Sequence, residues 1–173
     1  MIREATAADA AACARIYAPY VTGSVVSFEA QPPSPGEMAR RIGQAHLWLV
    51  AEEHGEVQGY AYGGPHQQRA AYRWAADVSV YLDPRHQGRG LGRALYTSLF
   101  GGLADLGVCV VCAGVALPNP ASEALHRSMG FEVVGTYRRI AFKAGRWIDT
   151  RWYQRDLRPP GEPPPAEAPG RPR

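Results

Sequence analysis

Apolar and polar residues follow two periods along this chain, and these periods predict strands and helices. Apolar runs bounded by turn residues indicate strands at 2–5, 47–53, 56–63, 74–82, 108–115 and 131–137, with a short extended piece at 25–28. Apolar residues spaced three or four apart indicate helices that begin after Thr6, near Pro35, at Leu91 and at Pro120. Two dipeptides that end in glycine, His54-Gly55 and Ala144-Gly145, are typical of tight hairpin turns. The pattern predicts one mixed α/β domain, residues 1–157, on a central sheet.

The clearest helical stripe has a leucine every fourth residue. Its members are Leu91, Leu95, Leu99 and Leu103, and a stripe of this kind packs on a sheet. Gly101 and Gly102 weaken the C-terminal half of this helix by about 1 kcal/mol each relative to alanine. At the end of the chain, residues 158–173 are rich in proline, glycine, glutamate and arginine and show no apolar period, which predicts a disordered tail.

Composition and charge exclude several classes of protein. The chain has 173 residues, 46% of them hydrophobic, as in an ordinary globular domain. A dispersed net charge of +3 does not favour nucleic acid as a partner. No apolar run approaches the roughly 18 residues that span a bilayer, and the N-terminus does not resemble a signal peptide. We therefore expect no membrane partner and a cytoplasmic location.

Three cysteines are too few, and odd in number, for a disulfide framework. Cys109 and Cys112 have the spacing of a redox pair, which normally lies at a helix N-terminus. Here the pair falls in a predicted strand, where positions i and i+3 face opposite sides. We interpret both cysteines as small core residues.

The segment most suggestive of chemistry runs from Val78 to Leu95. A predicted strand leads into a basic loop with Gly88, Gly90 and Gly92, and this loop opens directly into a helix. Such a loop presents backbone N–H groups at the positive end of a helix, which is suited to a pyrophosphate. Arginines at 85, 89 and 93 add positive charge at its rim.

Three phosphate-binding patterns compete for this loop. A P-loop requires a lysine after the glycines, and a dinucleotide fingerprint requires a third glycine where Arg93 stands. The arrangement Gln87-x-x-Gly90-x-Gly92 instead resembles the Q/R-x-x-G-x-G/A loop of GNAT acetyltransferases. A plain glycine-rich connection remains the alternative.

A second segment is similar to the same family. Asn119 and Ser122 match the N-x-x-[AS] start of the GNAT helix that lies along the pantetheine arm of the cofactor, and Gly130-Phe131 match its end. His126 stands where most of these enzymes have a tyrosine. With the surroundings of Trp48, Arg69 and Trp147, this substitution resembles the phosphinothricin and methionine-sulfone (or sulfoximine) acetyltransferases.

The resemblance, from about Ile2 to Leu157, implies a GNAT fold with a mixed, mostly antiparallel sheet flanked by helices. It implies acetyl-CoA as co-substrate, direct attack of an amine on the thioester, no metal, and a homodimer. The strand before the loop would splay from its neighbour, so that backbone groups hold the acetyl and pantetheine. The implied cofactor-binding residues are Val80, Tyr81, Leu82, Gln87, Gly88, Arg89, Gly90, Leu91, Gly92, Arg93, Asn119 and Ser122.

Asp77 and His126 are the candidate catalytic residues. Asp77 shares one face of its strand with Ser79 and Tyr81, and a carboxylate in an apolar strand is unfavourable unless it is paired or functional. The resembled enzymes have a glutamate here that helps deprotonate the amine; Asp77 is one methylene shorter, which favours a relaying water. The resemblance makes His126 a second proton-transfer group, for the amine or for the departing thiolate. A buried structural carboxylate that is hydrogen-bonded to backbone is the alternative for Asp77, and a structural histidine is the alternative for His126.

Substrate selection is expected from Arg69, Tyr72 and Phe28. A guanidinium suits a carboxylate or phosphinate, and the two aromatic rings can form pocket walls. The resembled enzymes often have a lysine two residues before Arg69, where this chain has Gln67. Arg73 is a candidate to replace that charge, and a solvated surface pair is the alternative for the two arginines.

The sequence thus predicts an N-acetyltransferase acting on the α-amine of a small amino acid or analogue, with a detoxifying use. Acetylation of a protein N-terminus or lysine is one alternative, and a non-catalytic acetyl-CoA sensor is another.

Overall fold

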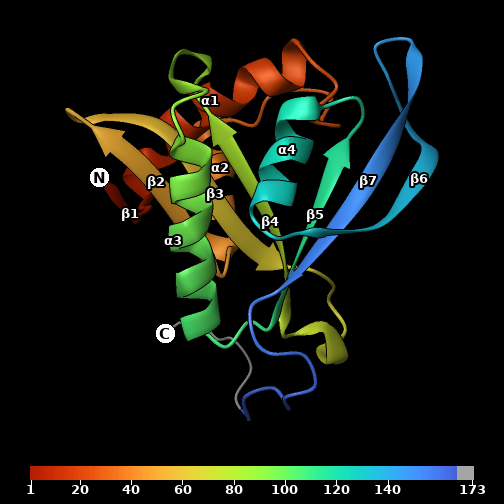
Figure 1. Cartoon of the computed structure of the whole chain (residues 1–173). Coiled ribbons are helices and arrows are strands. Elements are labelled where there is room, and N and C mark those ends of the chain that lie inside the picture. The colour runs from red at the N-terminus through yellow and green to blue at the C-terminus, as the bar shows by residue number, and fades with distance from the viewer. Residues whose placement is uncertain (167–173) are drawn as a thin grey trace.

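Seven strands form the sheet in the order β1-β2-β3-β4-β5-β7-β6 (Figure 1). The computed structural model describes residues 1–166. The strands are β1 (Ile2–Glu4), β2 (Leu47–Glu53), β3 (Glu56–Pro65), β4 (Ala75–Leu82), β5 (Val110–Ala116), β6 (Glu132–Lys143) and β7 (Arg146–Asp156). Among the strands of residues 1–166, only β4 and β5 pair in parallel, and the other neighbours are antiparallel. The predicted mixed, mostly antiparallel sheet is confirmed.

Helices cover both faces of this sheet (Figure 1). They are α1 (Ala10–Thr22), α2 (Pro35–Gln44), α3 (Leu91–Asp105) and α4 (Pro120–Ser128). The first is preceded by a 3₁₀ turn at Ala7–Asp9, so the helix expected directly after Thr6 begins later. The Asp9 carboxylate accepts the Thr6 backbone N–H at 2.8 Å and holds this entry in place.

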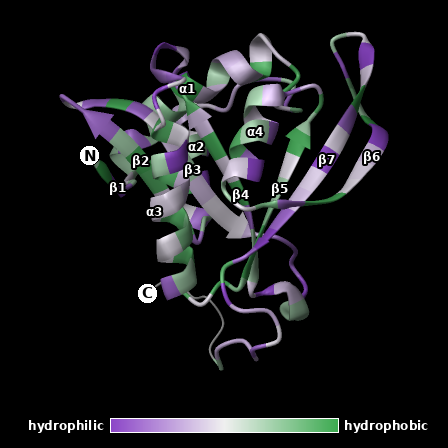
Figure 2. Cartoon of the chain, in the orientation of Figure 1, coloured by the Kyte–Doolittle hydropathy of each residue, from purple (hydrophilic) through white to green (hydrophobic). Residues whose placement is uncertain are grey.

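The apolar side chains form one core on each face of the central strands. Leu95, Leu99 and Leu103 of α3 are fully buried against β2 to β5, which confirms the leucine stripe. On the opposite face, α1 and α2 pack on β2 and β3 around side chains such as Met38 and Tyr60. Figure 2 shows β5 as largely hydrophobic, while β7 and β6 have many more polar residues. Buried residues are most frequent in β2, β3 and β5, which contribute to the core under α3.

Helix α3 continues through the two glycines to Asp105. Gly101 faces open space, whereas a Cβ at Gly102 would lie 2.5 Å from Leu47 Cδ2. The small residue at 102 lets the helix approach β2 closely, and this packing outweighs the low helix propensity of glycine.

Two predicted segments differ from the structure. Residues 25–28 are irregular rather than extended; Val25 instead packs with Ala116 and Ile148. The predicted strand 131–137 does not end at Tyr137 but continues as one strand, β6, to Lys143, directly before the turn predicted at Ala144-Gly145.

The end of the described chain contains no further regular element. Residues 158–166 form neither helix nor strand, and the rest of the predicted tail, 167–173, lies outside the described residues. No helix between residues 1 and 166 has the length and apolar character needed to cross a membrane.

Candidate functional site

Strands β4 and β5 separate in the middle of the sheet. They pair only through Ala75–Val110, Ala76–Val111 and Asp77–Cys112, although β4 continues to Leu82 and β5 to Ala116. Beyond Asp77, the backbone N–H and C=O groups on the facing edges no longer have each other as partners. The splay expected from the resemblance is present, and it begins at the candidate catalytic aspartate.

A narrow cavity of about 60 Å³ occupies this opening. Its walls are the backbone of Val78–Tyr81 and Ala113–Ala116, and α4 contributes Asn119, Ser122 and His126. The Asn119 side chain accepts the Ser122 backbone N–H at 3.2 Å and thereby caps α4. The structure thus brings the predicted residues of the strand and of the helix to one opening, and Asn119 also has a structural task there.

His126 is buried, with an exposed fraction of 4%. Its Nδ1 lies 2.7 Å from the Ser122 carbonyl oxygen, so this nitrogen carries the proton and donates. Its Nε2 lies 3.2 Å from the Tyr96 hydroxyl, which can then donate to it. Burial lowers the pKa of His126, and the bond to Ser122 opposes this shift. A neutral imidazole with both nitrogens engaged is therefore favoured in this state.

A second, wider cavity has a volume of about 570 Å³. Asp77 and Cys112, the last residues paired across β4 and β5, line it together with His66 and Gln67. Its other wall comes from β6 and β7, through residues 134–137 and 152–154. Asp77 and Cys112 thus line the wide cavity, and the next residues along the same strands, Val78 and Ala113, line the narrow one.

Asp77 forms a hydrogen bond that the sequence did not predict. Its Oδ1 lies 2.6 Å from Nδ1 of His66, which follows directly on β3. Burial raises the pKa of Asp77, and the contact with His66 opposes that shift. The expected structural alternative, a carboxylate bonded to backbone, is thus replaced by a side-chain pair. His66 could have been found only from the register of β3 on β4, which pairs Gly64 with Asp77.

Cys112 lies beside this pair. One ligand-type atom from each of His66, Asp77 and Cys112 falls within 4.8 Å of the others. A metal would need a thiolate, but burial raises the pKa of Cys112 to about 11, so the thiol is neutral at neutral pH. Nδ1 and Oδ1 already satisfy each other. We therefore interpret the group as a hydrogen-bonded pair next to a neutral thiol.

The three predicted substrate residues lie in different parts of the structure. The Tyr72 ring lies edge-on to the His66 ring, with centroids 5.8 Å apart, and Arg69 is exposed at the start of the short 3₁₀ turn Ala70–Tyr72. Phe28 is half-exposed in the irregular segment after α1, and none of the three predicted substrate residues is among those that line the wide cavity. Arg73 lies over the Trp74 ring, 4.1 Å from its centroid. That guanidinium is engaged in stacking rather than standing in for the missing lysine.

The glycine loop has the backbone that its sequence requires. Gly88 and Gly90 have φ values of 74° and 79°, a region that favours glycine, and Gly90 directly precedes α3. Gln87 donates to the Tyr20 hydroxyl at 3.0 Å, and Tyr20 donates to the Leu82 carbonyl at 2.6 Å. The loop is thereby tied to both α1 and the end of β4.

The arginines of this loop differ in their partners. Arg85 pairs with Asp83 and Glu56 at 2.8 Å each, and it lowers the pKa of Asp83 to about 2. Its charge is therefore compensated by the protein, which corrects the expectation that it adds positive charge to the rim. Arg93 donates to the Ser128 carbonyl at 3.3 Å, at the end of α4, and Arg89 is exposed. Arg89 and the backbone amides remain as the groups for an anion.

The whole folded part of the chain matches a known family. A model described as an acetyltransferase (GNAT) domain matches residues 2–152. The chain belongs to the GNAT acetyltransferase family. The implied fold and enzyme class, an N-acetyltransferase, are thus confirmed.

Individual relatives of this GNAT enzyme narrow the comparison. It is 41% identical to a phosphinothricin N-acetyltransferase of Streptomyces viridochromogenes, over 95% of this chain and 91% of the relative. It is 40% identical to an L-methionine sulfoximine/L-methionine sulfone acetyltransferase of Salmonella typhimurium, over 63% of this chain and 64% of the relative. A solved phosphinothricin acetyltransferase from Sinorhizobium meliloti in complex with AcCoA superposes with a TM-score of 0.92 at 37% identity, covering 97% and 94% of the two chains. The predicted subfamily resemblance is confirmed.

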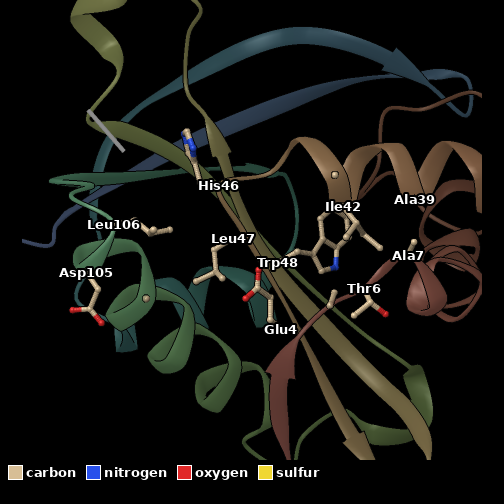
Figure 3. Close-up of a pocket in the computed structure, with 13 residues that line it drawn as sticks. Glu4, Thr6, Ala7, Ala39, Ile42, His46, Leu47, Trp48, Asp105 and Leu106 are labelled. Carbon is tan, nitrogen blue, oxygen red and sulfur yellow. The ribbon is translucent and has the colours of Figure 1, made fainter. Parts of the chain in front are cut away.

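One further cavity of this acetyltransferase lies away from the strand opening. It measures about 560 Å³ and lies among α2, the start of β2 and the end of α3 (Figure 3). Ile42, Leu47 and Leu106 give it a partly apolar lining, with Glu4 and Asp105 at its edge. It contains none of the predicted site residues, so we do not assign the reaction to it.

Proposed function

We propose that this GNAT enzyme transfers the acetyl group of acetyl-CoA to the α-amine of a small amino acid or analogue. Phosphinothricin, methionine sulfone and methionine sulfoximine represent the acceptor class. The supporting observation is that the two cavities are lined by adjacent residues where the strands part: Asp77 and Cys112 line the wide one, and Val78 and Ala113 line the narrow one. A thioester in the narrow opening would present its carbonyl to an amine held in the wide one.

The cofactor placement follows from the loop and the opening. The pyrophosphate would lie on the amides of 88–92, where the start of α3 favours an anion. The pantetheine would run along residues 80–82 and beside Asn119 and Ser122, and a strand amide aimed at the acetyl oxygen would stabilise the tetrahedral oxyanion.

Direct attack by the amine is the simplest route in this site. Burial raises the pKa of Cys112 to about 11 and that of Cys13 to about 12. Both thiols are therefore protonated at neutral pH and are poor nucleophiles. An acetyl-cysteine intermediate on either residue is accordingly disfavoured.

The acceptor would occupy the wide cavity. Its volume of about 570 Å³ is ample for one amino acid, and Trp152 and Tyr137 provide aromatic surface. Tyr72, whose ring contacts His66, and Arg69, at the start of the same 3₁₀ turn, would hold the acidic group of the acceptor. Gln67, in the position of the missing lysine, offers a neutral hydrogen bond instead of a charge. Acetylation of a toxic analogue there would remove its free amine, which is the basis for a detoxifying role.

The two candidate catalytic groups would serve opposite ends of the reaction. Asp77 lines the acceptor side, where an ammonium must lose a proton before it can attack. His126 and the Ser122 hydroxyl line the cofactor side, where the departing thiolate must gain one. This division follows from the side of the strand opening on which each group lies.

A thiol-release assay tests the proposed function. Purified enzyme with acetyl-CoA is screened against the amino acids, the two methionine derivatives, phosphinothricin, a peptide N-terminus and a lysine peptide. We expect rapid CoA release with one or more of the small amines. Release with peptides alone would favour the protein acetyltransferase alternative. Tight acetyl-CoA binding without turnover on any acceptor would favour the sensor.

We also propose that the enzyme is a homodimer. The outer part of the β6–β7 hairpin exposes five large apolar side chains, each more than half exposed: Val134, Tyr137, Ile140, Phe142 and Trp147. Contiguous apolar surface on an edge strand is typical of an interaction site. A second copy of the chain is the occupant that we propose.

A further inference from the structure

We propose that His66 is the group that accepts the proton of the substrate ammonium, and that Asp77 positions its ring. This inference rests on the proposed small-amine acetyltransferase function and names the base for it.

The hydrogen bond between the two residues sets the roles of the ring nitrogens. Nδ1 of His66 lies 2.6 Å from Oδ1 of Asp77. An ionised carboxylate only accepts hydrogen bonds, so Nδ1 carries the proton and donates it. In the neutral ring the lone pair then lies on Nε2, at the far end of the imidazole. An Asp–His pair of this kind holds a base in one tautomer and stabilises its protonated form.

The ring is also held by packing. The His66 backbone N–H donates to the Ala75 carbonyl at 3.3 Å, at the point where β3 leaves β4. The ring lies edge-on to Tyr72 on one side and Trp152 on another, with centroids 5.8 and 6.1 Å apart. The His66 side chain is 24% exposed and lines the wide cavity. The imidazole is therefore oriented, yet still open to an acceptor.

This arrangement removes the need for the relaying water expected from the short aspartate. Asp77 lies on the strand itself, and its Oδ1 is engaged by His66. The basic atom is instead Nε2 of His66, which lies at the far end of the imidazole ring from Asp77 and thus closer to the proposed acceptor. Histidine is also the side chain whose ordinary pKa lies nearest neutrality, which is suited to general-base work. The other titratable groups that face His66 are few: Cys112 on β5, Tyr72 in the 3₁₀ turn, and Tyr137 and Tyr153 along the cavity wall.

The proton balance of the reaction is then complete. The substrate R–NH₃⁺ gives one proton to His66 Nε2, and the free amine forms an N–C bond with the thioester carbonyl. The tetrahedral intermediate collapses as the C–S bond breaks. The second proton of the former ammonium passes to the thiolate, which leaves as CoA–SH. His66 releases its proton to solvent, so the products are the amide, CoA–SH and H⁺.

The substitution His66→Asn tests this assignment. The Asn amide places a donor near the position of Nδ1, so the bond to Asp77 can persist, but no atom replaces Nε2. We expect kcat to fall by about 10²–10⁴-fold, while the KM for acetyl-CoA and the melting temperature stay near wild type. The matched control is His54→Asn in the β2–β3 turn, where φ is 51° and asparagine is well tolerated. This control should retain wild-type turnover.

The pH profile separates His66 from Asp77 as the base. In the wild type, kcat/KM rises with pH as the base loses its proton, and this limb should vanish in His66→Asn. In Asp77→Asn it should persist, because the His66 ring that takes the proton is still present. Acceptors with different amine pKa values show which part of the pH profile comes from ionisation of the substrate. All profiles are recorded in EDTA, so that a bound metal does not contribute.

Three results would overturn the inference: His66→Asn as active as His54→Asn, a limb that persists in His66→Asn but vanishes in Asp77→Asn, or loss of wild-type activity in EDTA. Each of these presupposes an active wild-type enzyme. A wild type that acetylates no small amine would instead contradict the proposed function, so the two failures are distinguishable.

Discussion

At the scale of single residues, the position of Asp77 and its hydrogen bond explain how an apolar strand accommodates a carboxylate. Its neighbours Ala76 and Val78 face the α3 core and are buried. Asp77 points to the other side, where β4 parts from β5 and His66 supplies a hydrogen bond. A partly buried carboxylate with one partner keeps a raised pKa. The same placement that permits the charge also makes it available for chemistry.

Arg69 gives a prediction at this scale. If its exposed guanidinium holds an acidic group of the acceptor, Arg69→Ala should raise the acceptor KM by roughly 10- to 150-fold, the equivalent of a charge-assisted hydrogen bond of about 1.5–3 kcal/mol. The KM for acetyl-CoA should change little. Arg73→Ala removes the same charge nearby, but from a guanidinium stacked on Trp74, and should change the acceptor KM less than threefold. The measurement is steady-state kinetics with each substrate varied in turn. If Arg69 acts only by electrostatic steering or by supporting the structure, Arg69→Ala should affect both substrates equally.

At the scale of elements, the junction of β4, the glycine loop and α3 is fixed by local rules and by ties to other elements. Positive φ values at Gly88 and Gly90 turn the chain so that α3 begins immediately. Gln87 and Tyr20 then anchor the loop to the end of β4. The loop is therefore preorganised to bind an anion.

Replacing Gly90 by valine should disrupt this element. A β-branched residue is disfavoured at a φ of 79°, and its side chain would stand where the loop approaches the phosphates. We expect the KM for acetyl-CoA to rise at least tenfold, measured at saturating acceptor. Gly101→Val, in an exposed part of α3 with open space around it, is the matched control and should leave that KM within twofold. Unchanged cofactor kinetics in a folded Gly90→Val enzyme would rule out this placement of the pyrophosphate.

At the scale of the whole molecule, the ends of the sheet differ. The β1 end is short and is held by Arg3, which contacts Asp9 at 2.8 Å and Glu52 at 2.6 Å. The β6 end is twelve residues long and carries exposed apolar side chains. Because β6 and β7 also form one wall of the wide cavity, a partner on this hairpin would influence the acceptor site.

The proposed homodimer predicts a mass of twice 18.8 kDa. Light scattering on the eluting peak should give this value for the wild type. Phe142→Lys, at a side chain that is 62% exposed, should shift the mass to that of one chain. Thr97→Lys, on the exposed face of α3, adds the same charge elsewhere and should remain dimeric. A wild type that elutes as one chain across micromolar concentrations would contradict the proposal.

Local chemistry accounts for what the sequence by itself determined. Helix α2 begins where predicted, because Ser34 accepts the Glu37 N–H at 3.1 Å and Pro35 suits the first turn. The turn at His54-Gly55, the leucine stripe and the glycine loop are likewise set by neighbours in the chain. Of the predicted cofactor residues, Val80, Tyr81, Asn119 and Ser122 come to one opening. The individual roles of the cofactor residues, like those of Asp77 and His126, stay predictions.

Only the tertiary structure decided the features that depend on distant pairing. Periodicity shows which residues alternate, but not which strand lies beside which, so the place of β7 between β5 and β6 could not be read from it. The register of β3 on β4 brought His66 to Asp77, and Asp83 and Glu56 compensated Arg85. No periodic pattern in the sequence connects the residues that make these contacts. They come together because the whole sheet packs in this strand order and register.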